Sequence, residues 1–453
     1  MTGTVEQSSF RDRDGFIFYK NDSVYRAINA SYKDTWELLS QSEFFNALLK
    51  NDKVVGFETE ENTSFGGAYK TLKLQKVRFI SYPSEWTFAQ LKKAALLTLD
   101  IQKKALLNGF TLKDASAYNV QFNGNKAVFI DTLSFELYKE GEPWHAYKQF
   151  CQHFLGPLLL WHYGAGEMKS LFIDHIDGIP LKLSSKMLPF RSKFNLLAYT
   201  HLHLHAKFEE KHAGEKKVSN STLKISKARS LTLIEHLEQG IKSLKIKKQD
   251  TNWTDYYDSF SYTEAGYNAK KTFIEKHASA IKGQLCADLG ANSGEFSALA
   301  AKHFKYVVAC DSDVEVVSAI QKKKIDNVLA LHVNLINPTP AFGWNNTERK
   351  SFTGRIKGAE LTMALALIHH LCIGNNIPLA GLAEFFAGLS DQLIIEFVPK
   401  TDVQVKKLLV TKKDIFDDYT VENFRLAFGK YFQVADHQDI PGSGREIFLM
   451  KKT

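Results

Sequence analysis

The chain has 453 residues, of which 44% are hydrophobic and 24% charged. This composition does not favour disorder, and the length favours two or three domains over one. Its formal net charge of +8 permits an anionic partner but does not require one. The four cysteines lack metal-site spacing and no apolar run is long enough for a membrane span or signal peptide, so we expect a cytoplasmic protein with no membrane partner.

The first half of the chain contains a helical run over residues 86–110, followed by a polar loop and a predicted hairpin over 119–130. Asp114 stands five residues before Asn119, and Asp131 closes the second strand of the hairpin. This order resembles the catalytic segment of protein-kinase-like and aminoglycoside-phosphotransferase-like folds. The resemblance implies that Asp114 is the base and that Asn119 and Asp131 are Mg²⁺ ligands.

The same segment departs from the kinase pattern in several ways. Lys113 replaces the usual residue before the aspartate, and Asp131 is followed by Thr132-Leu133 without the expected glycine. Upstream, only the glycine pair within 64–74 approaches a phosphate loop. We therefore interpret residues 1–205 as an α+β domain of kinase-like type that recognises substrate or regulates access, in preference to an active phosphotransferase. An unrelated fold with an accidental D-x4-N spacing is the alternative.

Residues 206–254 are rich in lysine and are predicted to form a helical connection. Up to Asp250 this stretch holds ten Lys and one Arg against six acids, a local balance of +5. The charge fits a solvated helix face, and a phosphate-binding face is the alternative. Just before it, His201 and His205 lie one helical turn apart without an evident third ligand, so we expect no metal there. The run 145–164 is expected to be a core helix broken at Gly156-Pro157.

From about residue 283 the sequence alternates between short apolar runs and segments of helical spacing. Strands are predicted at QLCADLG, YVVACD, NVLALHV, ELTMALAL, QLIIEFV and REIFLMKK. Strands that alternate with helices are typical of an open α/β sheet with both faces covered. Ligands of such sheets bind beyond the carboxyl ends of the strands, which makes the residues there the candidates for a site.

The first of these strand ends reads ADLGANSGEFS, with glycines at 290 and 294 that allow a tight turn into a helix. A dinucleotide is one candidate ligand, but its GxGxxG fingerprint is absent. Asp288 and Glu295 place negative charge beside the turn, which would repel a pyrophosphate and suits a cationic ligand. S-adenosylmethionine carries a sulfonium, an ammonium and a ribose diol but no phosphate.

This segment resembles the first motif of class I S-adenosylmethionine-dependent methyltransferases, and the resemblance extends over residues 255–453. It implies a Rossmann-like sheet, S-adenosylmethionine as cofactor, and an acid at the second strand end, Asp311 with Asp313 as a second candidate, that binds the ribose hydroxyls. At the third strand end Asn334 stands where the family often has aspartate, and its amide would meet the adenine. The residues implied around the methionine part are Asp288, Gly290, Asn292 and Gly294.

The fourth strand end carries His369 and His370, and the family often has a similar HHL after this strand. Either imidazole is a candidate base for an acceptor hydroxyl or amine, and a helix-capping or pocket-lining role is the alternative. The strand end lacks the Asp/Asn-Pro-Pro-Tyr and Pro-Cys patterns that the family uses on nucleobases, and Cys372 is not in such a context. The sequence therefore disfavours methylation of DNA bases.

The aromatic segment WTDYYDSFSYT precedes the sheet where the family often closes a helix over the cofactor. Tyr257 or Tyr262 would cover the sulfonium by a cation–π contact, with packing between domains as the alternative. By its position, Lys270 is a candidate to bind the carboxylate of the methionine part.

The chain as a whole resembles large bacterial methyltransferases loosely grouped with nodulation proteins, which implies a methyltransferase with an unidentified acceptor. The alternatives are RNA methylation through the basic connection and a non-catalytic regulatory protein with degenerate nucleotide sites.

Overall fold

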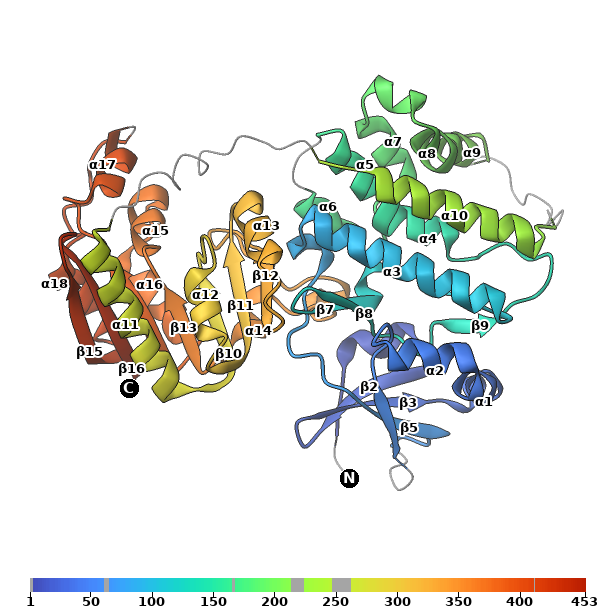
Figure 1. Cartoon of the computed structure of the whole chain (residues 1–453), viewed down its shortest axis with the longest axis horizontal. Coiled ribbons are helices and arrows are strands. Elements are labelled where there is room, and N and C mark those ends of the chain that lie inside the picture. The colour runs from blue at the N-terminus through green and yellow to red at the C-terminus, as the bar shows by residue number, and fades with distance from the viewer. Residues whose placement is uncertain (1–2, 61–64, 165–167, 213–223, 247–261, 411) are drawn as a thin grey trace. The chain divides into compact units, whose positions relative to one another are not determined.

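The computed structural model describes residues 3–60, 65–164, 168–212, 224–246, 262–410 and 412–453, which form two compact units (Figure 1). Unit 1 consists of Met1–Phe122, Lys126–Lys248 and Phe342–Arg349, and unit 2 consists of Asn123–Asn125, Gln249–Ala341 and Lys350–Thr453. The basic stretch 206–254 contains helix α10 (Lys227–Ser243), which lies in unit 1. Lysines 247 and 248 and residues 213–223 of that stretch, like Tyr257, lie outside the described residues.

Unit 1 begins with an antiparallel sheet in the order β1-β2-β3-β5-β4. Asn21 and Asp22 both have left-handed backbone and join β2 to β3 in a two-residue turn that matches the twist of paired strands. Phe18, Tyr25 and Ala27 form a small buried core on this sheet. The strands are β1 (Thr4–Val5), β2 (Gly15–Lys20), β3 (Ser23–Ile28), β4 (Phe57–Glu60) and β5 (Lys70–Leu74).

The predicted long helix of unit 1 is α3 (Phe88–Leu107), which begins at a capping box formed by Thr87 and Gln90. The predicted hairpin is also present, as β7 (Val120–Asn123) and β8 (Lys126–Phe129). The other elements of this unit are α1 (Lys33–Gln41), α2 (Glu43–Lys50), β6 (Phe110–Leu112), β9 (Phe135–Leu137), α6 (Lys169–Asp174), α7 (Leu181–Met187), α8 (Leu196–Ala198) and α9 (Leu204–His212).

The core helix predicted over 145–164 is present but is not broken at Gly156-Pro157. The chain runs from α4 (Tyr147–Phe150) through a π-helical turn over Cys151–Leu155 directly into α5 (Gly156–His162). Pro157 occupies the first turn of α5. The N–H of Gly156 before it donates to the carbonyl of Cys151, and the carbonyl of Gln152, which a residue with an N–H at position 157 would meet in the π-helical register, accepts instead from the N–H of Ile179 at 3.2 Å. The widened turn therefore absorbs the proline that was expected to end the helix.

Unit 2 is built on a sheet in the order β12-β11-β10-β13-β14-β16-β15. Its first five strands are parallel and β16 is antiparallel to β14, with helices on both faces (Figure 1), which confirms the predicted Rossmann-like α/β sheet. In β11 the four residues Val307–Cys310 are completely buried, as expected of a strand covered on both faces. The strands are β10 (Gly283–Leu289), β11 (Phe304–Asp311), β12 (Val328–His332), β13 (Leu361–Ala364), β14 (Gln392–Phe397), β15 (Phe432–Ile440) and β16 (Arg445–Lys452).

Among the described residues of unit 2, β15 is the one strand that the sequence does not predict. Its sequence FQVADHQDI is largely polar because it forms the edge of the sheet and pairs only with β16, across a bulge between Val434 and Asp436. The helices of the unit are α11 (Glu264–Ile281), α12 (Glu295–Ala300), α13 (Val314–Lys322), α14 (Phe352–Ile356), α15 (Ile368–Asn375), α16 (Leu379–Ala387), α17 (Val403–Val410) and α18 (Val421–Phe428).

The cysteines and histidines of the chain form no metal centre in the part that the structure describes. All four cysteines are buried and free, and no group of three potential ligands converges among the described side chains. His201 instead bonds to His236 and to the hydroxyl of Tyr147. Within the same described ranges, no helix is both long and apolar enough to cross a bilayer.

Candidate functional site

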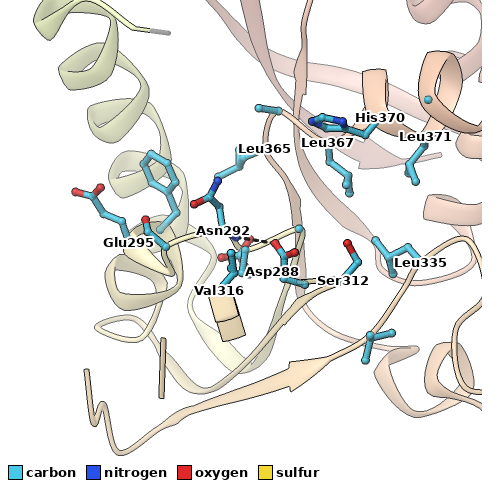
Figure 2. Close-up of a pocket in the computed structure, with 18 of the residues that line it drawn as sticks. Asp288, Asn292, Glu295, Ser312, Val316, Leu335, Leu365, Leu367, His370 and Leu371 are labelled. Atoms are coloured by element: carbon cyan, nitrogen blue, oxygen red, sulfur yellow. Dashed lines mark hydrogen bonds between the residues drawn. The ribbon is translucent and has the colours of Figure 1, made fainter. Parts of the chain in front are cut away.

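A pocket of about 630 Å³ lies at the carboxyl ends of β10, β11 and β13 in unit 2. Figure 2 shows the side chains of Asp288 and Asn292 at the glycine turn, with Leu365, Leu367 and His370 lining the cavity beyond it. The structure therefore brings together most of the predicted site residues, which come from separate strand ends. Tyr262, Gly290, Asp311 and Asn334 also line the pocket, whereas Gly294 and His369 do not.

The turn between β10 and α12 contains three residues with left-handed backbone, Gly290, Asn292 and Gly294, with φ of 74°, 44° and 69°. The N–H groups of Gly290 and Ala291 both donate to the carbonyl of Cys310, at 2.9 and 3.0 Å, which fixes the turn to β11. A Cβ at Gly294 would lie 2.7 Å from Cγ1 of Ile320 on α13. The two glycines are therefore needed for backbone conformation and for close packing.

We expect Gly294→Ala to destabilise the protein by roughly 2–4 kcal/mol, because left-handed backbone costs an L-residue ~1–2 kcal/mol and the new methyl collides with Ile320. Chemical denaturation measures the loss. Gly381→Ala is the matched control, since Gly381 lies within α16 and its new Cβ would meet no atom within 4 Å. Equal stabilities for the two variants would contradict the packing argument.

Asp311, at the end of β11, is the acid that faces the pocket at the second strand end. Its Oδ2 accepts a hydrogen bond from the Asn292 N–H and its Oδ1 one from the Asp313 N–H, each at 3.0 Å. Burial raises the pKa of Asp311, and these two N–H groups oppose the rise. Asp313 is instead the N-cap of α13, accepts from the N–H of Glu315 at 2.8 Å, and does not line the pocket.

Asp288 lies beneath the glycine turn and is almost completely buried. Burial raises its pKa to about 6, while the hydrogen bond from the Ser297 hydroxyl and the charge of Lys270 lower it. Glu295, in the first turn of α12, also lines the pocket. This end of the pocket is therefore acidic, which disfavours a pyrophosphate.

The two histidines of the fourth strand end have different surroundings. His370 lines the pocket, and burial together with Arg445 lowers its pKa to about 4. His369 is completely buried and lies outside the pocket lining, and neither of its ring nitrogens has a hydrogen-bond partner in the part of the chain that the structure describes. Burial, then the neighbouring His370, lowers the pKa of His369 well below the ordinary value. Both rings are therefore neutral near pH 7, and only His370 is placed to meet an acceptor.

A buried ionic network closes the pocket on the side of β14 and β16. Lys270 Nζ donates to Glu396 Oε2 at 2.7 Å and to the Tyr262 hydroxyl at 2.9 Å, and that hydroxyl donates to Glu396 Oε1 at 2.6 Å. Arg445 donates to the same hydroxyl at 2.5 Å and, through Nε, to Asp402 at 2.8 Å. The ring of Tyr262 thus carries two cations of the protein itself, with Lys270 4.8 Å and Arg445 4.4 Å from its centroid.

The sequence did not single out Glu396, Asp402 or Arg445. The available signal was Glu396 in the apolar strand LIIEFV, because a carboxylate in a strand buried on both faces needs a cationic partner. Its partners Lys270 and Arg445 are 126 and 49 residues away in the sequence, so only the assembled sheet identifies them.

The kinase-like residues of unit 1 form a separate cluster. Asp131 accepts from Arg26 Nη2 and from the Ser134 hydroxyl, both at 2.5 Å, and Asn119 donates to the same hydroxyl at 3.4 Å. Asp114 accepts from the Ser116 N–H at 2.8 Å, and burial raises its pKa. Both oxygens of Asp131 are engaged by protein donors, which does not fit a Mg²⁺ ligand unless Arg26 moves. Nucleotide binding by this segment stays a prediction.

Several solved structures are similar to between 41% and 46% of the chain. The N-methyltransferase NodS from Bradyrhizobium japonicum WM9 covers 42% of this chain and 97% of NodS, with 7% identity and a TM-score of 0.33. Magnesium protoporphyrin IX methyltransferase (ChlM) from Synechocystis PCC 6803 with bound SAH covers 46% of this chain and 90% of ChlM, with 16% identity and a TM-score of 0.32. TM-scores this low do not establish the fold, which is assigned from the strand order of unit 2.

Sequence comparison gives a similarity over the full length. No model of a protein family matches the chain. The nodulation protein NoeA from Rhizobium meliloti (strain 1021) is 32% identical over 461 residues, which span 98% of this chain and 95% of NoeA. Because this similarity extends over nearly all of both proteins, the chain belongs to the NoeA family, and its unit 2 has the class I methyltransferase fold.

Proposed function

We propose that the protein transfers a methyl group from S-adenosylmethionine to an acceptor bound in the pocket of unit 2. The proposal rests on the placement of Asp311. Its carboxylate accepts a hydrogen bond from the Asn292 N–H of the glycine turn at the end of β11, and the residue lines the cavity. A carboxylate so fixed can accept hydrogen bonds from the two hydroxyls of a ribose. The acidic surroundings then select a nucleoside that carries positive charge and no phosphate.

The residues of the pocket fit the parts of this cofactor. Asp311 would hold the ribose, and Val316 and Asn334 would meet the adenine beside it. The turn at Gly290 and the carboxylate of Asp288 would face the charged methionine part. S-adenosylmethionine, when bound, supplies an electrophilic methyl group on a positively charged sulfur.

The protein's own contribution is to place the acceptor, exclude water and accept a proton. Leu365, Leu367 and Leu371 line the pocket beyond the glycine turn and would remove water from an acceptor held there (Figure 2). His370 is neutral near pH 7 but has a pKa of about 4, which makes it a weak base. It therefore suits an acceptor group whose proton becomes acidic as the new bond forms.

Calorimetric titration of the full-length protein with S-adenosylmethionine, S-adenosylhomocysteine and NAD⁺ tests the proposal. We expect the two adenosyl ligands to bind with a dissociation constant on the order of 10 µM, about 7 kcal/mol, and NAD⁺ not to bind. Labelled methyl groups can then be followed into candidate acceptors. A folded, ligand-free protein that binds NAD⁺ or binds none of the three would overturn the proposal.

The affinity for S-adenosylmethionine is expected to be constant above about pH 6 and to fall by up to tenfold per pH unit below it. The pKa of Asp288 in the free protein is about 6, and a cation favours its ionised form, so binding below this pH must release a proton. Calorimetric titrations between pH 5 and 8 measure the change in affinity, and repeating them in buffers of different ionisation enthalpy measures the number of protons released.

Asp288→Asn serves as the control for this pH dependence, because it keeps the shape of the side chain but has no proton to release. We expect its profile to be flatter and its binding weaker near neutral pH. S-adenosylhomocysteine, which lacks the sulfonium charge, should show a smaller dependence in the wild-type protein. A slope that Asp288→Asn leaves intact would assign the titration to another group.

A further inference from the structure

The guanidinium of Arg445, a residue that lines the pocket, has one donor without a partner among the described residues. Its side chain is 1% exposed and lines the pocket, yet Nη2 has no hydrogen-bond partner among the described residues. The other two nitrogens are engaged, Nε by Asp402 at 2.8 Å and Nη1 by Tyr262 at 2.5 Å and Glu396 at 3.3 Å. A buried N–H group without a partner is costly, so Nη2 is a position where a ligand oxygen would be stabilised.

The position of Arg445 places this donor away from the predicted ribose site. Arg445 begins β16, which is separated from β10 by β13 and β14. Three steps between neighbouring strands amount to about 14 Å at the level of the backbone. Asp311 lies one strand further in the opposite direction, on β11. The unused donor therefore lies on the side of the pocket that remains for the acceptor.

The charges around Arg445 decide which kind of oxygen fits. Lys270 and Arg445 are already balanced by Glu396 and Asp402, all of them buried. An added carboxylate would be a third anion in this network and would face the further carboxylates Asp288 and Asp311 across the pocket. The free energy needed to bury an unbalanced charge in such a site exceeds the free energy that one hydrogen bond contributes. An uncharged carbonyl oxygen satisfies the donor without this cost.

We propose, on the basis of the methyl transfer proposed above, that Arg445 Nη2 binds an uncharged carbonyl oxygen of the methyl acceptor, as found in an amide. The acceptor class is thus an amide-bearing neutral molecule and not a carboxylic acid. Tyr262 and Glu396 act as positioning residues, because they hold Nη1 and thereby fix the plane of the guanidinium.

Fragments that differ only in the polar group test this proposal. Benzamide, benzoate and benzyl alcohol are titrated against full-length protein saturated with S-adenosylhomocysteine, and ligand-observed NMR reports binding. We expect benzamide to bind at least tenfold more tightly than the other two. Arg445→Lys should remove this preference, because it keeps a positive charge beside Glu396 and Asp402 but lacks Nη2.

Arg425→Lys is the matched control, since Arg425 is half-exposed on α18, pairs with Glu446 at 2.6 Å and does not line the pocket. It should keep the tenfold preference for benzamide. Preference for benzoate, absence of fragment binding, or a preference unchanged in Arg445→Lys would overturn the inference. Thermal denaturation of each variant verifies that it is folded.

Titrations with the cofactor product separate this inference from the proposed function. Failure of the wild-type protein to bind S-adenosylhomocysteine would overturn the proposed function and the inference with it. The methionine carboxylate is the competing occupant of Nη2. If Arg445→Lys weakens S-adenosylhomocysteine tenfold or more but leaves its decarboxylated analogue unchanged, Arg445 holds that carboxylate, and the acceptor assignment is overturned while the proposed function stands.

Discussion

Replacing Asp311 by alanine is expected to weaken the binding of S-adenosylhomocysteine about 100-fold. Each hydrogen bond between a carboxylate and a ribose hydroxyl contributes roughly 1.5 kcal/mol, and two such bonds correspond to a factor of about 100. The variant also frees the Asn292 N–H that Asp311 holds at 3.0 Å, so the glycine turn loses a tether to β11. Calorimetric titration of both proteins at pH 7.5 measures the loss.

Asp313→Asn is the control that makes this result specific, because Asp313 is a nearby acid that caps α13 and does not line the pocket. We expect its affinity for S-adenosylhomocysteine to stay within about threefold of the wild-type value. If instead Asp313→Asn loses binding and Asp311→Ala retains it, the second acid of ACDSD binds the ribose. If both variants bind S-adenosylhomocysteine as tightly as the wild-type protein, neither Asp311 nor Asp313 binds the ribose.

The strand ends of unit 2 could be predicted from the sequence because each carries a local signal. Gly290 and Gly294 are glycines where the backbone is left-handed, and Asp311 follows directly on a buried apolar run. Such signals depend on a few neighbouring residues and on the physics of one turn or one strand. Such signals can therefore be recognised in the sequence without knowledge of the tertiary structure.

Other features depend on contacts that no local pattern contains. The sequence could not separate His369 from His370, because only the direction of α15 decides which ring meets the pocket. The edge strand β15 was missed, since an edge strand needs no continuous apolar run. Arg26 was not connected with Asp131, because these residues lie 105 positions apart and meet only in the folded unit 1.

Glu396→Gln is expected to destabilise the protein by roughly 3–5 kcal/mol, because it leaves Lys270 without its carboxylate in a site where both side chains are almost completely buried. For a unit of this size the melting temperature should fall by about 10 °C. Burial raises the pKa of Glu396, but the charges of Lys270 and Arg445 lower it more, and the net pKa is lowered. Differential scanning calorimetry and chemical denaturation at pH 7 measure the loss.

The lowered pKa also fixes how this contribution depends on pH. In acid the unfolded chain protonates Glu396 before the folded protein does, so the stabilisation is complete above the unfolded-state pKa and is lost as pH falls through the folded-state value. The difference in stability between wild-type protein and Glu396→Gln should therefore shrink below about pH 4.

A double variant distinguishes a buried charge from simple loss of packing. Lys270→Met combined with Glu396→Leu removes both charges, so it should cost less than the sum of the two single variants by roughly 2–3 kcal/mol. Arg425→Gln, at a half-exposed ion pair of the same unit, should change stability by less than about 1 kcal/mol. Strict additivity of the two buried substitutions would mean that Lys270 and Glu396 are not coupled, and the network that closes the pocket would then not be electrostatic in origin.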